Sequence, residues 1–143
     1  MIEKRRDELK PGDVFASSHG YDVLVGKVQD TAEVRTDERH VGIVGYLHGD
    51  PANSARIERY EASSTVEVYS LIEFATELMM RATARFERGM QMIEAEARPN
   101  QIVMQFTSAA NGYQAVARLV QWGQEMAHAE SYTLGGVVAE VTA

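Results

Sequence analysis

The sequence predicts an α+β protein. A small antiparallel β-barrel or bent sheet is followed by a long amphipathic helix, a strand, a second helix and a short terminal strand. Residues 13–70 hold short runs rich in Val, Ile, Tyr and Phe, separated by turn-forming residues. From Leu71 onward the apolar residues recur at helical steps of three and four. We therefore expect a barrel-like region over 1–70 and a helical region over 71–143 that packs on it as one structural unit.

Length and composition favour an ordinary intracellular domain. The chain has 143 residues, enough to bury a core of its own. It has no Cys, which excludes disulfides, thiolate zinc sites and a cysteine nucleophile. The net charge of −7 disfavours non-specific nucleic-acid binding. The N-terminus lacks the apolar core of a signal peptide, and no apolar run reaches the roughly 20 residues that span a bilayer. We expect a cytoplasmic protein that does not bind membranes.

The β-type region opens at Pro11-Gly12-Asp13, a turn between Leu9 and Val14 in which proline sets the backbone angle. Val, Ile and Tyr alternate with polar residues in the runs that follow, most clearly in 55–61 and 64–70. Many short strands at close spacing are typical of a barrel or a strongly bent sheet. The expected strands are 13–17, 22–28, 32–35, 40–47, 55–61 and 64–70.

A long helix is predicted over 71–98. Ser70 and Glu73 have the spacing of a capping box at its start, and Pro99 should end it. Its length would be about 40 Å, long for a domain of this size. We therefore expect that Gly89 bends the helix or that part of it packs on another chain. Its apolar stripe consists of Ile72, Ala75, Met79, Ala82, Phe86, Gly89 and Ile93.

Three further elements complete the predicted fold. Alternation of Ile102, Met104 and Phe106 favours a strand over 101–107. A helix should follow, capped by Ser108 or Asn111. A Gly-Gly turn then leads into a terminal strand over 137–141. A right-handed crossover could place this strand beside the strand over 101–107.

Two histidines in predicted loops are candidates for chemistry. His19 and His48 each precede a glycine and lie close in sequence to Asp22 and Asp50. If the two loops met, two imidazoles and a carboxylate could bind a metal ion and support an enzyme. The alternative, which we favour, is that these are turn residues selected for backbone conformation. Ser17 and Ser18 lack the elbow motif of a hydrolase. We predict no catalytic residue, no metal and no cofactor.

The same loops are our candidate surface for recognising another protein. An alternative is a nucleic-acid-binding regulator that uses basic residues of the barrel, although acidic residues are interleaved with them. The basic residues are Lys4, Arg5, Arg6, Lys10, Lys27, Arg35 and Arg39. The predicted partner-binding residues are His19, Tyr21, Asp22, His48 and Asp50.

The long helix is our candidate for self-association. Met80 and Met92 lie off its main stripe, so the helix is apolar on more than one side. That pattern favours a second contact, most simply with another copy, unless the barrel and the second helix cover both sides. The predicted interface residues are Ile72, Met79, Phe86, Ile93 and Trp122. The leading interpretation is thus a non-enzymatic interaction module that forms a homo-oligomer through this helix.

Overall fold

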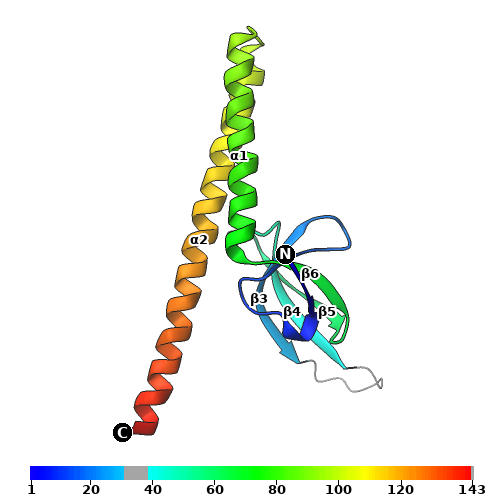
Figure 1. The fold of residues 1–143 in the computed structure, drawn as a ribbon, viewed down its shortest axis with the longest axis vertical. Helices are drawn as coiled ribbons and strands as arrows, with labels where there is room; N and C mark the ends of the chain where they lie inside the picture. Colours follow the sequence, from blue (N-terminus) through cyan, green and yellow to red (C-terminus); the bar gives the residue numbers. More distant parts are fainter. Residues whose placement is uncertain (31–38, 143) are drawn as a thin grey trace.

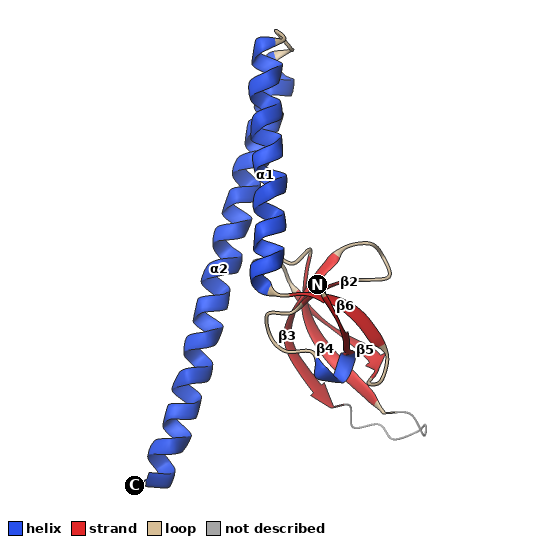
Figure 2. Cartoon of the chain, viewed as in Figure 1, coloured by secondary structure: helices blue, strands red, loops and turns tan. Residues whose placement is uncertain are grey.

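The computed structural model describes residues 1–30 and 39–142 and confirms the α+β prediction. A six-stranded antiparallel sheet is followed by two long helices that form a hairpin (Figures 1 and 2). The sheet has the strand order β1-β6-β2-β3-β4-β5, so β1 and β5 are its edges. The elements are β1 (Ile2–Arg5), the 3-10 helix η1 (Arg6–Glu8), β2 (Val14–Ala16), β3 (Asp22–Asp30), β4 (His40–Leu47), β5 (Ala55–Glu61), β6 (Thr65–Tyr69), α1 (Leu71–Glu94) and α2 (Pro99–Thr142).

Both faces of the sheet carry buried residues, and side chains along a strand alternate between the two faces. Phe15 and Val23 belong to a core cluster on one face, together with Ile43 of β4. Val14 and Leu24, their sequence neighbours, belong to a second cluster on the other face. That second cluster contains Phe74 and Ala75 from α1 and Val116 and Leu119 from α2. The sheet therefore rests on the helical hairpin through one face and encloses its own core with the other.

Helix α1 begins as the sequence predicts. The Ser70 hydroxyl accepts a hydrogen bond from the Glu73 backbone N–H, and the Glu73 carboxylate accepts one from the Ser70 N–H. Two of the N–H groups that lack a partner within the helix are thus satisfied. The helix ends at Glu94, before Pro99, which is the first residue of α2. Proline is well suited to that position because the first helical N–H has no partner within the helix.

The two helices approach closely through small residues. A Cβ atom added to Gly112 would lie 2.9 Å from the Cβ of Ala82, and one added to Gly89 would lie 3.0 Å from the ring of Phe106. The length of α1 was expected to require a bend at Gly89 or packing of part of the helix on another chain. In the structure, Gly89 packs on Phe106 of α2. Beyond Gly123, beside Leu71 at the start of α1, helix α2 continues without α1 (Figure 1).

The predicted strand over 101–107 is wrong, because these residues form part of α2. Alternation of Ile102, Met104 and Phe106 resembles a strand, but Ile102 and Phe106 also have helical spacing to Ala109. Ala109 is buried, whereas Met104 is 67% exposed. Helical packing against α1 therefore decides the conformation, and the period-two pattern is coincidental.

The predicted terminal strand over 137–141 is also wrong, since α2 continues through Thr142. A strand needs a neighbour to share its hydrogen bonds, and α2 carries the chain away from the sheet (Figure 2). Ser108 and Asn111 lie inside α2 and are not its cap. Within the described residues, neither helix has a stretch long and apolar enough to cross a bilayer.

Strand β1 was not predicted. Its sequence, Ile-Glu-Lys-Arg, is dominated by charge, and it forms a strand because it pairs with β6 in the register Ile2 to Val68. An edge strand tolerates such charged residues. The predicted strand over 32–35 lies outside the described residues. The remaining predicted strands correspond to β2, β3, β4, β5 and β6.

Candidate functional site

The sheet brings the two candidate loops together at one end. Strands β3 and β4 pair with Val23 opposite Leu47, so the loop before β3 lies beside the loop after β4. The first loop is a hairpin connection closed by hydrogen bonds from the Ser17 N–H to the Tyr21 carbonyl and from the Gly20 N–H to the Ser17 carbonyl. Both loops are hairpin connections of the sheet, as the sequence indicates.

The rings of His19, Tyr21 and His48 form a row that we call the ring cluster. The Tyr21 ring stacks on His19 with centroids 6.1 Å apart and meets His48 at 5.5 Å. Both histidines are exposed and Tyr21 is half-buried between them. His48 has a positive φ of 59°, followed by Gly49 at 65°, so the tight turn fixes the direction of its side chain. Three of the five predicted partner-binding residues thus form one surface patch.

Asp50 has a different role. Its carboxylate accepts hydrogen bonds from Nε of Arg118 at 3.1 Å and from Nη2 at 2.6 Å, and from the Ala52 N–H at 3.0 Å. The Arg118 hydrogen bond is the main cause that holds the pKa of Asp50 below its ordinary value. The residue therefore joins the β4–β5 loop to α2.

Asp22 also faces a helix. Its carboxylate lies 4.0 Å from Nη1 of Arg81 on α1, a longer and more exposed contact than that of Asp50. The two candidate carboxylates thus contact the helices, whereas the three rings contact one another. In the described part of the chain, no group of three or more His, Asp or Glu side chains could hold a metal ion.

A row of uncharged residues runs along an outward side of α1, next to the side that packs on α2. Its members follow alternating steps of four and three, the spacing of a coiled-coil seam. The apolar members Ile72, Met79, Phe86, Met90 and Ile93 are between 42% and 76% exposed. The predicted stripe of α1 therefore contains two faces, because Ala75, Ala82 and Gly89 are buried. The row consists of Ile72, Thr76, Met79, Thr83, Phe86, Met90 and Ile93.

A second row with the same spacing runs along α2, beside the first. The hydroxyls of Thr83 and Tyr113 are 2.9 Å apart, and the rings of Phe86 and Phe106 meet edge to face at 5.4 Å. No residue of this α2 row is charged and none is buried. The row consists of Val103, Phe106, Ala110, Tyr113, Ala117, Val120, Gln124 and Ala127. The two rows together are called the hairpin face.

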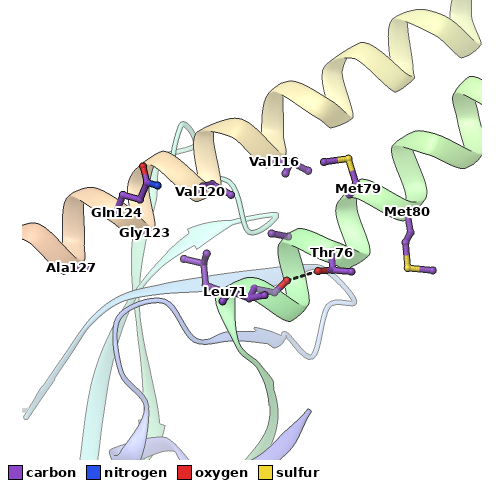
Figure 3. A pocket seen from close by; sticks show the side chains of 11 residues that line it. Leu71, Thr76, Met79, Met80, Val116, Val120, Gly123, Gln124 and Ala127 are labelled. Carbon is purple, nitrogen blue, oxygen red and sulfur yellow. Dashed lines mark hydrogen bonds between the residues drawn. The ribbon is translucent and has the colours of Figure 1, made fainter.

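The hairpin face is hollowed near the start of α1. A groove of about 600 Å³ lies between the helices there (Figure 3). Nearly all of its lining is apolar. The principal lining residues are Ile72, Met79, Met80, Val116, Val120 and Ala127. Four residues of the α1 row, Ile72, Met79, Phe86 and Ile93, were predicted from the sequence as interface residues. The α2 row was not predicted, because its first residues were assigned to a strand.

Trp122, the fifth predicted interface residue, lies away from the hairpin face. It is half-buried against the core cluster between sheet and hairpin, and its ring meets Tyr46 edge to face at 5.9 Å. Trp122 therefore helps to attach α2 to the sheet.

Several of the basic residues considered for nucleic-acid binding contact acidic residues of the same chain. Arg6 lies over the Tyr60 ring, 4.4 Å from its centroid, and donates a hydrogen bond to the Ser64 hydroxyl. Arg35 lies outside the described residues. The acidic contacts are Lys4 with Asp13, Arg5 with Asp7, and Arg39 with Asp30 and Asp7. These contacts offset the positive charge that a phosphate backbone would require.

No family model and no curated protein matches the sequence. Among solved structures, part of the chain is similar to a translation initiation factor eif-5a family protein from Naegleria fowleri ATCC 30863. The identity is 10%, the TM-score is 0.37, and the match covers 48% of this chain and 46% of that one. Eukaryotic translation initiation factor 5A from Methanococcus jannaschii gives 13% identity and a TM-score of 0.36, covering 48% and 49% of the two chains. The match spans about half the length of these proteins.

Proposed function

We propose that the protein is a non-enzymatic interaction module that forms a homo-oligomer through the hairpin face and recognises a partner protein with the ring cluster. The observation that carries the proposal is the exposed coiled-coil seam of α1. Ile72, Phe86 and Ile93 lie on it at heptad positions, and all three are exposed in the single chain. Exposed apolar residues at this spacing along a whole helix favour another helix as the covering element.

The size of the hairpin face suits a stable interface. The 24 residues of α1 give a length of about 36 Å, and two adjacent helices give a width of about 20 Å. The resulting area of about 700 Å² is close to the roughly 800 Å² per partner of a standard protein–protein interface. The absence of charged residues from both rows removes the desolvation cost that charges would add on association.

Association through this face leaves the ring cluster accessible. The sheet packs on the hairpin through Phe74, Leu78 and Leu119, which lie on a different side of the helices from the two rows. Aromatic side chains such as Tyr21 offer a large contact area at low conformational cost, which suits a protein-binding surface. One surface can therefore assemble copies while the other remains available to a partner.

The mass in solution tests the proposal. By light scattering after size exclusion, the wild type should have a mass above the 15.9 kDa of one chain. Phe86→Glu should reduce the mass to that of a monomer, because it places a charge at an apolar position of the seam. Ala84→Glu is the matched control, since Ala84 is exposed on α1 but belongs to neither row. A monomeric wild type, or an oligomer unchanged by Phe86→Glu, would refute the proposal.

A further inference from the structure

We infer that two copies pack their hairpin faces against each other in antiparallel orientation, so that the tip of one hairpin fills the groove of the other. The tip is the end near the α1–α2 connection, and the base is the end near Leu71 and Gly123. This arrangement rests on the proposed self-association and specifies its partner and geometry. The assembly is a four-helix bundle in which each chain contributes both helices.

The first support is that the two rows are continuous and lie side by side. Each helix of a four-helix bundle contacts two neighbours, so each needs two apolar seams. Helix α1 has an inner seam that includes Ala75, Ala82 and Gly89, which faces α2 or the sheet, and an outer seam that includes Ile72 and Phe86. The inner seam is occupied within the chain. The outer seam has the geometry to receive a helix from a second copy.

The second support is the difference in shape between the two ends of the hairpin face. At the base, the groove lies between the two helices and is lined by Ile72, Met79 and Val120 (Figure 3). Toward the tip, the rows carry bulky residues, with Phe86 packed edge to face on Phe106 and with Ile93 49% exposed. Bulk at one end and a hollow at the other are complementary only if the second hairpin is reversed.

The third support is the symmetry of the α1 row. A two-fold axis that lies between the two copies and passes α1 at the level of Thr83 brings Ile72 of one copy to the level of Ile93 of the other. The same axis brings Met79 to the level of Phe86, and a two-fold interface repeats each of these contacts twice. The reversed order also makes the α1 helices of the two copies antiparallel, which opposes their dipoles. If the two hairpins were parallel, with both tips at the same end, the two grooves would face each other and would remain unfilled.

Cysteine cross-linking tests the orientation directly, because the chain has no Cys and each introduced thiol is unique. Ile72→Cys and Ile93→Cys are prepared as separate proteins, their masses are measured, and they are mixed, re-equilibrated and treated with a short bismaleimide. We expect cross-linked dimers in the mixture, at the fraction that random pairing gives, and none in either variant alone. Thr76→Cys with Met90→Cys is a second pair of the same design, in which Thr76→Cys replaces a hydroxyl by a thiol and removes only one methyl group.

The outcomes separate this inference from the proposed function. Cross-links within Ile72→Cys alone, or within Ile93→Cys alone, would show that both tips lie at the same end and would overturn the antiparallel arrangement while leaving self-association intact. A dimer that cross-links in neither pair would show that another surface joins the copies. A wild type that is monomeric at every concentration would overturn both the inference and the proposed function.

Discussion

The guanidinium of Arg118 on α2 donates two hydrogen bonds to the carboxylate of Asp50, at 2.6 Å from Nη2 and 3.1 Å from Nε. This pair joins a loop at the end of the sheet to the middle of the second helix. The Asp50 side chain is 18% exposed and that of Arg118 is 41% exposed. The two-point geometry makes this contact stronger than an ordinary surface ion pair, although solvent screens part of it.

Asp50→Asn should lower the free energy of unfolding by about 1 kcal/mol at neutral pH, since one charge-assisted contact is lost. Denaturant unfolding followed by the fluorescence of Trp122, the one tryptophan of the chain, measures this change. Asp22→Asn is the control, because the Asp22 carboxylate lies 4.0 Å from Arg81 and should contribute less. An equal effect of the two substitutions would show that the bidentate geometry adds nothing.

The same pair predicts a pH dependence. The pKa of Asp50 is lower in the folded protein than in the unfolded chain, chiefly because Arg118 hydrogen-bonds the carboxylate. The stabilisation is therefore complete above the unfolded pKa of about 4 and is lost as the pH falls through the lower folded pKa. The difference in Tm between the wild type and Asp50→Asn should shrink as the pH is lowered below 4. A difference that stays constant down to acid unfolding would contradict this assignment.

How far the sequence could predict this structure depended on how local each signal was. The Ser70–Glu73 capping box is contained within four residues, and it was correctly identified. The meeting of His19 and His48 on either side of Tyr21 depends on the register of β3 and β4, which no local pattern specifies. The sequence therefore placed both histidines in loops but could not place them together.

The helical region shows the same limit. Ile72 and Ala75 belong to one apolar stripe of the sequence, yet Ile72 is 76% exposed and Ala75 is buried. Only the position of α2 separates them, because a helix periodicity does not say which part of a wide apolar face meets which neighbour. The conformation of residues 101–107 depended on the same contact, since packing of Phe106 beside α1 outweighed an alternating pattern.

Gly49→Ala should destabilise the protein by about 3 kcal/mol. Gly49 has a φ of 65°, and a Cβ atom there would lie 2.4 Å from the Phe74 ring, so backbone strain and overpacking add. Gly20→Ala is the matched control, because Gly20 also has a positive φ of 85° but has no atom within 4 Å of the added Cβ. Backbone strain alone should cost about 1 kcal/mol there. Thermal or denaturant unfolding compares them, and equal losses would rule out a steric role for Phe74.

Arg6→Lys should lower stability by about 1 kcal/mol, although it conserves the charge. The Arg6 guanidinium stacks on the Tyr60 ring at 4.4 Å and donates to the Ser64 hydroxyl at 2.9 Å, and a lysine ammonium cannot reproduce the planar stacking together with that hydrogen bond. Arg5→Lys is the control, since Arg5 is more exposed and pairs with Asp7. Chemical unfolding of both variants measures the difference. A stability of Arg6→Lys equal to that of Arg5→Lys would show that the stacking contributes nothing.

A close contact between the two helices, at Gly112 and Ala82, predicts a loss of stability that a second substitution restores. In an unhindered helix, replacing glycine by alanine stabilises by about 1 kcal/mol. At Gly112 the added Cβ would lie 2.9 Å from that of Ala82, so Gly112→Ala should instead destabilise by about 1–2 kcal/mol as the helices are pushed apart. The double variant Ala82→Gly/Gly112→Ala moves the methyl group across the contact without adding one, and should recover most of the lost stability. Unfolding free energies of the wild type, both single variants and the double variant form a thermodynamic cycle. If the two single effects simply add, the helices do not meet at this pair, and the hairpin must be packed differently.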